Sequence, residues 1–202
     1  MPIRQLYQCD GRRLRRRAVA LGLVAGLLAF SLVKSVRSRP EHIAAAEVWS
    51  FIQEVAPERG LDPEFVYALA WAESSLNAKA RSSVARGIMQ LTRPAWAEMS
   101  EVSYRQAWDW KTNIRVAVDY LAFCRDFLER HDAFTYPLLA ASYRYGPYYV
   151  QDKGFDIRRL RRPKNELYRR IFEGEVHPVA PPESRGPEVI SVGIGRIGGS
   201  AA

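Results

Sequence analysis

The feature that most constrains how this chain can fold is a run of eight consecutive apolar residues that begins at Phe65. The three residues before it, Asp62-Pro63-Glu64, supply a helix N-cap, a proline in the first turn and an early acid that suits the helix dipole. A helix that is apolar on nearly every side belongs in the middle of a domain. The sequence therefore predicts a buried helix over about residues 63–74.

Helical spacing of apolar residues recurs elsewhere in the chain. The further helices that it predicts cover residues 41–58, a short segment from Thr92, residues 113–130 and residues 136–145. Gly60 ends the first of these, and the Ser, Asn and Gly content of residues 75–90 predicts a loop. The sequence contains no alternating pattern of strand length and no internal repeat, so the predicted fold class is all-α.

The distribution of charge argues against a nucleic-acid partner. The chain has 202 residues, enough for one ordinary domain with tails, and a formal net charge of +8. Residues 1–40 hold nine basic residues and one acidic residue, which accounts for the whole excess. Residues 41–152 hold 11 basic and 15 acidic residues, whereas a protein that neutralises phosphates carries Lys and Arg on its folded part.

The first 40 residues predict export from the cytoplasm. Five arginines within positions 12–17 precede an uncharged, mainly apolar run of 16 residues from Ala18 to Val33. Positive charge is greater before the run than after it, which places the chain beyond about Arg39 outside the cytoplasm. A cleaved signal peptide and a membrane anchor both stay open, and the basic residues after the run favour the anchor. The expected location is the periplasmic side of a bacterial inner membrane.

The chain is expected to have three parts, a leader over residues 1–40, a folded domain over 41–175 and a tail over 176–202. Residues 153–170 are strongly basic and predict a loop followed by a short helix that ends near Phe172. Prolines and glycines dominate the last part, which predicts a flexible tail outside any site.

The positions of the cysteine and histidine residues predict neither a disulfide nor a metal site. Cys9 and Cys124 fall on opposite sides of the apolar run, so no disulfide between them is expected. Cys124 lies in an apolar helical pattern and is interpreted as a core residue. His42, His131 and His177 show no metal-ligand spacing, and neither a metal nor a cofactor is predicted.

Glu73 is the charged residue at the end of the apolar helix. It shares a helical stripe with Val66, Leu69 and Ala70, which faces the core. Burial without a cationic partner raises the pKa of a carboxyl group, which keeps a general acid protonated. Alternatively, Glu73 caps the next loop by accepting backbone N–H bonds from residues 75–77. Its position alone does not separate these interpretations.

Three linked motifs resemble those of the soluble lytic transglycosylase family, the SLT domain, which belongs to the lysozyme-like superfamily. Ala70-Trp71-Ala72-Glu73-Ser74-Ser75-Leu76-Asn77, Ser82 and Gly87-Ile88-Met89-Gln90-Leu91 resemble its Glu-Ser and Gly-Leu-Met-Gln motifs. Asn113-Ile114 with Tyr120-Leu121 resembles the middle motif, and Ala141-Ser142-Tyr143-Arg144-Tyr145-Gly146-Pro147 resembles the last. The match covers about residues 45–152 in the family's order and implies a lysozyme-like domain.

The resemblance also implies roles for individual residues. Glu73 would be the catalytic residue, and Ser82, Met89 and Gln90 would line the sugar-binding groove. Tyr143 would flank Glu73. Gly87 is expected to serve a backbone turn rather than to touch substrate.

Three departures from the family's pattern concern the groove. The loop over residues 82–87 is one residue shorter than is usual, and Arg86 takes a position that is commonly small or apolar. Arg144 replaces an asparagine that would ordinarily contact substrate, with Tyr145 and Tyr148 where small residues are common. Arg144 predicts a groove that is altered or partly occluded, with weak activity or an altered choice of substrate.

The implied activity is cleavage of the bond between N-acetylmuramic acid and N-acetylglucosamine in peptidoglycan, with a 1,6-anhydromuramyl end as product and Glu73 as acid and then base. One alternative is a lysozyme-type hydrolase with a second acid such as Asp109. Another is a glycan-binding or assembly protein without turnover. The expected partners are peptidoglycan strands and the inner membrane. A role in assisting an envelope or secretion machine is compatible with enzymatic activity.

Overall fold

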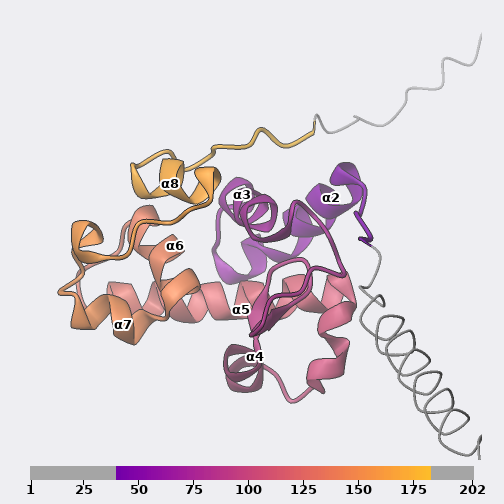
Figure 1. Ribbon diagram of the computed structural model, residues 1–202, viewed down its shortest axis with the longest axis horizontal. Coiled ribbons are helices and arrows are strands. Elements are labelled where there is room, and N and C mark those ends of the chain that lie inside the picture. The colour runs from indigo at the N-terminus through magenta and orange to yellow at the C-terminus, as the bar shows by residue number, and fades with distance from the viewer. Residues whose placement is uncertain (1–39, 183–202) are drawn as a thin grey trace, which may run out of the picture. The chain divides into compact units, whose positions relative to one another are not determined.

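The structure is a computed structural model that describes residues 40–182 (Figure 1). The predicted export run at residues 18–33 lies outside the described residues. Among the described residues, no helix combines the length and the apolar character needed to cross a bilayer.

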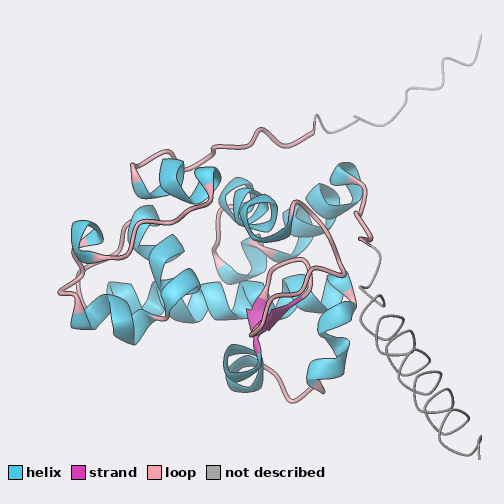
Figure 2. Ribbon diagram, viewed as in Figure 1, coloured by secondary structure: helices cyan, strands magenta, loops and turns pink. Residues whose placement is uncertain are grey.

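The described part of the chain is mostly helical, which confirms the predicted class (Figure 2). Two strands of two residues each, β1 and β2, form the only sheet within residues 40–182, and they pair antiparallel. In chain order the elements are α2 (Ala45–Val55), η1 (Pro57–Arg59), α3 (Pro63–Ser74), β1 (Ala85–Arg86), β2 (Leu91–Thr92), α4 (Arg93–Met99), η2 (Tyr104–Trp108), α5 (Trp110–Glu129), α6 (Tyr136–Tyr145), α7 (Pro147–Asp152), η3 (Ile157–Arg159) and α8 (Glu166–Phe172).

Helix α3 is the buried helix that the apolar run predicted. The Asp62 carboxylate accepts the N–H of Glu64 at 2.9 Å, and Pro63 occupies the first helical position. Every residue from Phe65 to Ala70 is buried. The helix packs against α2 and α8, so its apolar surface is covered by segments from both ends of the domain (Figure 1).

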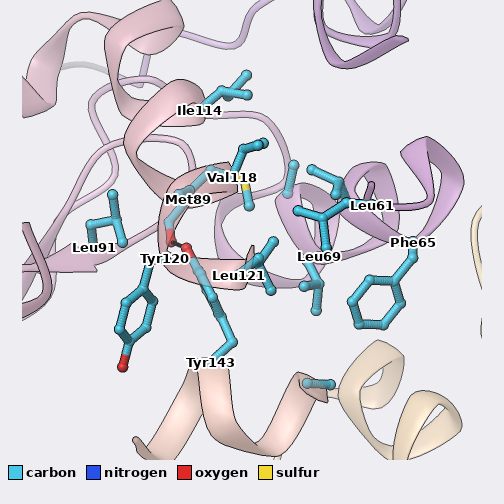
Figure 3. Close-up of a cluster of buried hydrophobic side chains, with 14 of the residues drawn as sticks. Leu61, Phe65, Leu69, Met89, Leu91, Ile114, Val118, Tyr120, Leu121 and Tyr143 are labelled. Atoms are coloured by element: carbon cyan, nitrogen blue, oxygen red, sulfur yellow. Dashed lines mark hydrogen bonds between the residues drawn. The ribbon is translucent and has the colours of Figure 1, made fainter. Parts of the chain in front are cut away.

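Helix α5 is the longest element, and α2, α4, α6 and α7 all pack against it. It begins at Trp110, three residues before the predicted start, because Asp109 caps it and accepts the N–H of Thr112 at 2.8 Å. The core lies between α3, α5 and α6. Figure 3 shows Leu69, Leu121 and Tyr143 from these helices converging on Met89.

The loop between α3 and α4 is fixed to α5 by the side chain of Asn113, which is fully buried. Its Oδ1 accepts the N–H of Met89 at 2.8 Å, and its Nδ2 donates to the carbonyls of Arg86 and Ala107 at 3.2 and 3.1 Å. Gly87 adopts a φ of 83°, and a Cβ there would lie 2.4 Å from the Asn113 amide nitrogen. The positive φ and the lack of space for a Cβ both require glycine at this turn, which agrees with the turn role predicted for Gly87.

The residues that directly follow α8 contact the folded domain. Val176 and Val179 pack against the core, and His177 Nε2 lies 2.5 Å from Asp62 Oδ2 at the start of α3. The first residues of the segment predicted as a tail therefore lie against the helix that carries Glu73.

Asn113→Ala is expected to lower the free energy of unfolding by about 2–4 kcal/mol, because one buried N–H and two carbonyls lose their partner. Urea denaturation followed by circular dichroism measures the change. Arg115→Ala, on the exposed face of the same helix, is the control and should cost less than about 1 kcal/mol. Equal losses for the two variants would show that the Asn113 hydrogen bonds do not hold the loop.

Candidate active site

Glu73 lies at the edge of a cavity of about 440 Å³ between the α3–α4 loop and the C-terminal end of α6. The lining residues come from α3, the β1–β2 hairpin, α4, α5 and α6, and they are Glu73, Ser82, Val84, Ala85, Gln90, Leu91, Thr92, Ala95, Tyr120, Tyr143, Arg144, Tyr145 and Gly146. Glu73 is the single carboxyl group among them. Three segments that the sequence motifs singled out therefore meet at one cavity.

A second hollow, of about 540 Å³, lies beside the start of α6 and the end of α8. Its acids, Asp156 and Glu173, are paired with Arg158 and Arg162 at 2.9 and 3.0 Å. The hydrogen bonds from Arg158 lower the pKa of Asp156 to about 2. An acid that stays ionised in this way cannot donate a proton near neutral pH, so the Glu73 cavity is the better candidate.

The Glu73 carboxyl is nearly buried, with 12% of its side-chain surface exposed. Burial raises its pKa above the ordinary value, and a hydrogen bond from Tyr168 and the charge of Arg144 oppose that rise without cancelling it. The alternative capping role does not hold, because the N–H groups of Ser75 and Asn77 bond instead to Trp71 and Ser74. The Glu73 carboxyl therefore does not cap the loop that follows it, and it faces the cavity.

Tyr168 is a site residue that the sequence analysis missed. Its hydroxyl donates to Glu73 Oε1, and burial raises the pKa of this fully buried phenol well above its ordinary value. Asn165 caps α8 and also donates to the carbonyl of Ala72 at 3.0 Å, which holds α8 against the end of α3. The apolar spacing of Tyr168 and Ile171 could have predicted burial, but not contact with a residue 95 positions away.

Arg144 lies on the other side of the Glu73 carboxyl. Its Nη1 is 3.8 Å from Glu73 Oε1, and its guanidinium lies 4.5 Å from the centre of the Tyr168 ring. The predicted departure from the family's asparagine therefore falls within the cavity. A cationic partner is present, contrary to the expectation of a carboxyl without one, although it does not outweigh burial.

Ser82, Gln90 and Tyr143, three of the four predicted groove residues, line the cavity. The Ser82 hydroxyl accepts the N–H groups of Val84 and Ala85 at 3.3 and 3.0 Å, so it also shapes the turn before β1. Gln90 has a positive φ of 49°, and its side-chain amide donates to the Gly87 carbonyl at 2.9 Å. These bonds hold the hairpin that forms one wall.

Met89 does not line the cavity, which corrects the prediction. Its side chain is fully buried in the hydrophobic core, while its carbonyl accepts the Tyr143 hydroxyl at 2.7 Å (Figure 3). The sulfur is a packing group because the side chain is fully buried, and the backbone N–H and carbonyl of Met89 bond to α5 and α6 respectively. Met89 therefore helps to hold the lining residues in place without lining the cavity itself.

Arg86, in the shortened loop, does not line the cavity. Its guanidinium stacks on Tyr104 and Trp108, 4.8 and 5.4 Å from the ring centres. The unusual residue therefore has a packing role under the hairpin. Of the two arginines that depart from the family's pattern, only Arg144 lines the cavity.

Asp109, the alternative second acid, caps α5 and does not line the cavity. Burial raises its pKa, but the hydrogen bonds from Thr112 and the charges of Lys111 and Lys79 leave it lowered. Within residues 40–182, no group of three or more His, Cys, Asp or Glu side chains is placed to hold a metal ion.

The described residues thus form a helical domain with one carboxyl group of raised pKa at its cavity. The sequence profile described as the transglycosylase SLT domain matches residues 50–159, more than half of the chain, and the chain belongs to this family. No curated protein matches the sequence. An inactive mutant of lytic transglycosylase Slt from Pseudomonas aeruginosa is similar in structure, with 23% identity and a TM-score of 0.46. That alignment covers 63% of this chain and 21% of the Slt chain.

Tyr168→Phe is expected to raise the pKa of Glu73, because the hydrogen bond that it removes favours the ionised carboxylate. Carboxyl ¹³C NMR over a pH series measures the change. Tyr143→Phe is the matched control, since its hydroxyl lies at the same cavity but donates to Met89, and it should shift the pKa of Glu73 less. An unchanged or lowered pKa in Tyr168→Phe would contradict the assignment.

Glu73→Gln is expected to stabilise the fold at about pH 8 and to have little effect near pH 4. A raised folded-state pKa means that the folded protein holds this proton more tightly than the unfolded chain does. Glu73 therefore destabilises the fold once pH exceeds its folded pKa, and the penalty fades toward the ordinary carboxyl pKa. Thermal denaturation over this pH range measures the difference. The same difference at both ends of the range would contradict it.

Proposed function

We propose that this protein is a peptidoglycan lytic transglycosylase in which Glu73 is the single catalytic acid and base. The observation that carries the proposal is the Glu73 carboxyl itself, because it is nearly buried, lines the cavity and has a raised pKa. Membership of the SLT domain family supports a peptidoglycan substrate.

The first step of the proposed reaction uses protonated Glu73. It donates its proton to the oxygen that joins N-acetylmuramic acid to N-acetylglucosamine, and the bond from that oxygen to C1 of the muramyl residue breaks. The acetamido carbonyl of the same sugar stabilises the positive charge at C1. Burial of Glu73 suits this step because it raises the pKa of the carboxyl group and so favours the protonated acid that donates.

The second step uses the carboxylate that the first step leaves. Glu73 takes the proton of the C6 hydroxyl, and the C6 oxygen bonds to C1, so that a 1,6-anhydromuramyl end forms without water. Tyr168 donates a hydrogen bond to Glu73, and Arg144 places a positive charge nearby. Both contacts stabilise the ionised form, so the same residue can exist in both states during one turnover.

The hydrolase alternative is less well supported by the geometry. Hydrolysis by two carboxylates needs a second acid at the scissile bond. Glu73 is the only carboxyl group that lines the cavity within the described residues, and Asp109 is committed to capping α5. A route in which the substrate supplies its own nucleophile needs only Glu73.

Peptidoglycan lies outside the cytoplasmic membrane, so the proposed function requires that the protein is exported. The arginine-rich segment and the apolar run at residues 18–33 support a location on the periplasmic side of the inner membrane. We propose wall remodelling or local wall opening as the setting, with an envelope machine as a partner.

Glu73→Gln is expected to remove the release of 1,6-anhydromuropeptides from purified sacculi, with a loss of at least about 10²-fold. Liquid chromatography with mass spectrometry identifies the products. Glu101→Gln, an exposed residue outside the cavity, is the control and should keep wild-type activity.

The products also separate the alternatives. Products heavier by one water molecule would indicate a hydrolase, and sacculus binding by the wild type without any release would indicate a glycan-binding protein. Anhydromuropeptide release by Glu73→Gln would contradict the role given to Glu73.

A further inference from the structure

Arg144 is a cation at the cavity with one acidic partner. About 30% of its side-chain surface is exposed, and within residues 40–182 its single ion pair is the contact with Glu73. Its guanidinium also lies 5.7 and 4.5 Å from the ring centres of Tyr145 and Tyr168. A guanidinium carries five N–H donors, more than one carboxylate and one phenol engage, so donors remain for a further acceptor.

The protonation state of Glu73 decides whether Arg144 is neutralised. The proposed reaction begins with Glu73 protonated, and a neutral carboxyl no longer balances the guanidinium. A partly buried cation without a counter-ion favours binding of an anion in its place. The catalytically ready cavity therefore presents a positive charge next to the acid.

We propose that Arg144 is a specificity-determining residue that binds a carboxylate of the substrate beside the glycosidic bond being cleaved. This inference rests on the proposed function, because it takes peptidoglycan as the substrate. The paired, planar donors of arginine fit a carboxylate better than a neutral hydroxyl or amide does.

Peptidoglycan offers that chemistry from two sources. The lactyl group on the muramyl ring is a free carboxylate where the stem peptide has been removed, and it is an amide where the peptide is attached. The stem peptide carries carboxylates of its own. The lactyl carboxylate is on the same ring as the C1 atom at which Glu73 acts, so the 3.8 Å between Glu73 and Arg144 suits it.

The test uses the full chain carrying Glu73→Gln, which stops turnover and imitates the protonated acid. Isothermal titration calorimetry compares three glycan oligomers of equal length. One has free lactyl carboxylates, one has these groups converted to methylamides, and one carries stem peptides. We expect the free-carboxylate glycan to bind about tenfold more tightly than the methylamide glycan.

Variants at residue 144 test whether Arg144 causes the preference for the free-carboxylate glycan. Arg144→Gln, added to Glu73→Gln, should reduce it to less than about twofold, and Arg144→Lys should retain part of it because the charge remains. The matched control is Arg130→Gln, which removes one exposed arginine that does not line the cavity and should leave the preference unchanged. Circular dichroism shows whether each variant is folded.

Each outcome decides the inference. If the peptide-bearing glycan alone binds tightly, the carboxylate comes from the stem. If it and the free-carboxylate glycan both bind tightly while the methylamide glycan binds weakly, either carboxylate serves. In both cases the role of Arg144 stands. Equal affinity for all three, or an equal loss for all three in Arg144→Gln, overturns the inference and leaves the proposed function intact. Failure to bind any of them contradicts the proposed function and this inference together.

Discussion

The junction between the C-terminal end of α3 and the start of α8 is the contact on which the site depends. Asn165, the N-cap of α8, donates to the carbonyl of Ala72, and Tyr168, three residues further on, donates to the carboxyl of Glu73. The apolar helix alone would leave Glu73 at an open helix end, where water would lower its pKa. Docking of α8 buries the carboxyl and also supplies the hydroxyl that stabilises its charged form.

The hairpin wall of the cavity depends on the backbone of one residue, Met89. The N–H of Met89 donates to Asn113 of α5, and its carbonyl accepts the hydroxyl of Tyr143 from α6. Three motifs that are well separated in the sequence therefore meet at one residue. Because both bonds are buried, displacement of either helix would leave a polar group without a partner, which couples the hairpin position to the helix core.

Much of the fold could be predicted from local signals, and the reasons are specific. The Asp62 cap, Pro63 and the apolar run fixed α3 at the predicted bounds, and the spacing over residues 136–145 did the same for α6. The start of α5 was misplaced because the cap at Asp109 was not recognised. The two-residue strands and η2 have no periodic pattern that a sequence could show.

The site was predicted only where motif and geometry coincide. Glu73, Ser82, Gln90 and Tyr143 meet at the cavity, but Met89 contributes its backbone and packing rather than a lining side chain. Tyr168 was missed because its importance comes from a contact across 95 residues, which no local pattern contains. Arg144 was recognised as a departure, yet its meaning depends on the charge of its neighbour. A guanidinium beside an ionised carboxylate is neutralised, whereas beside a protonated acid it attracts an anion. In the proposed mechanism, the proton on Glu73 therefore also governs the charge that the cavity offers to a ligand.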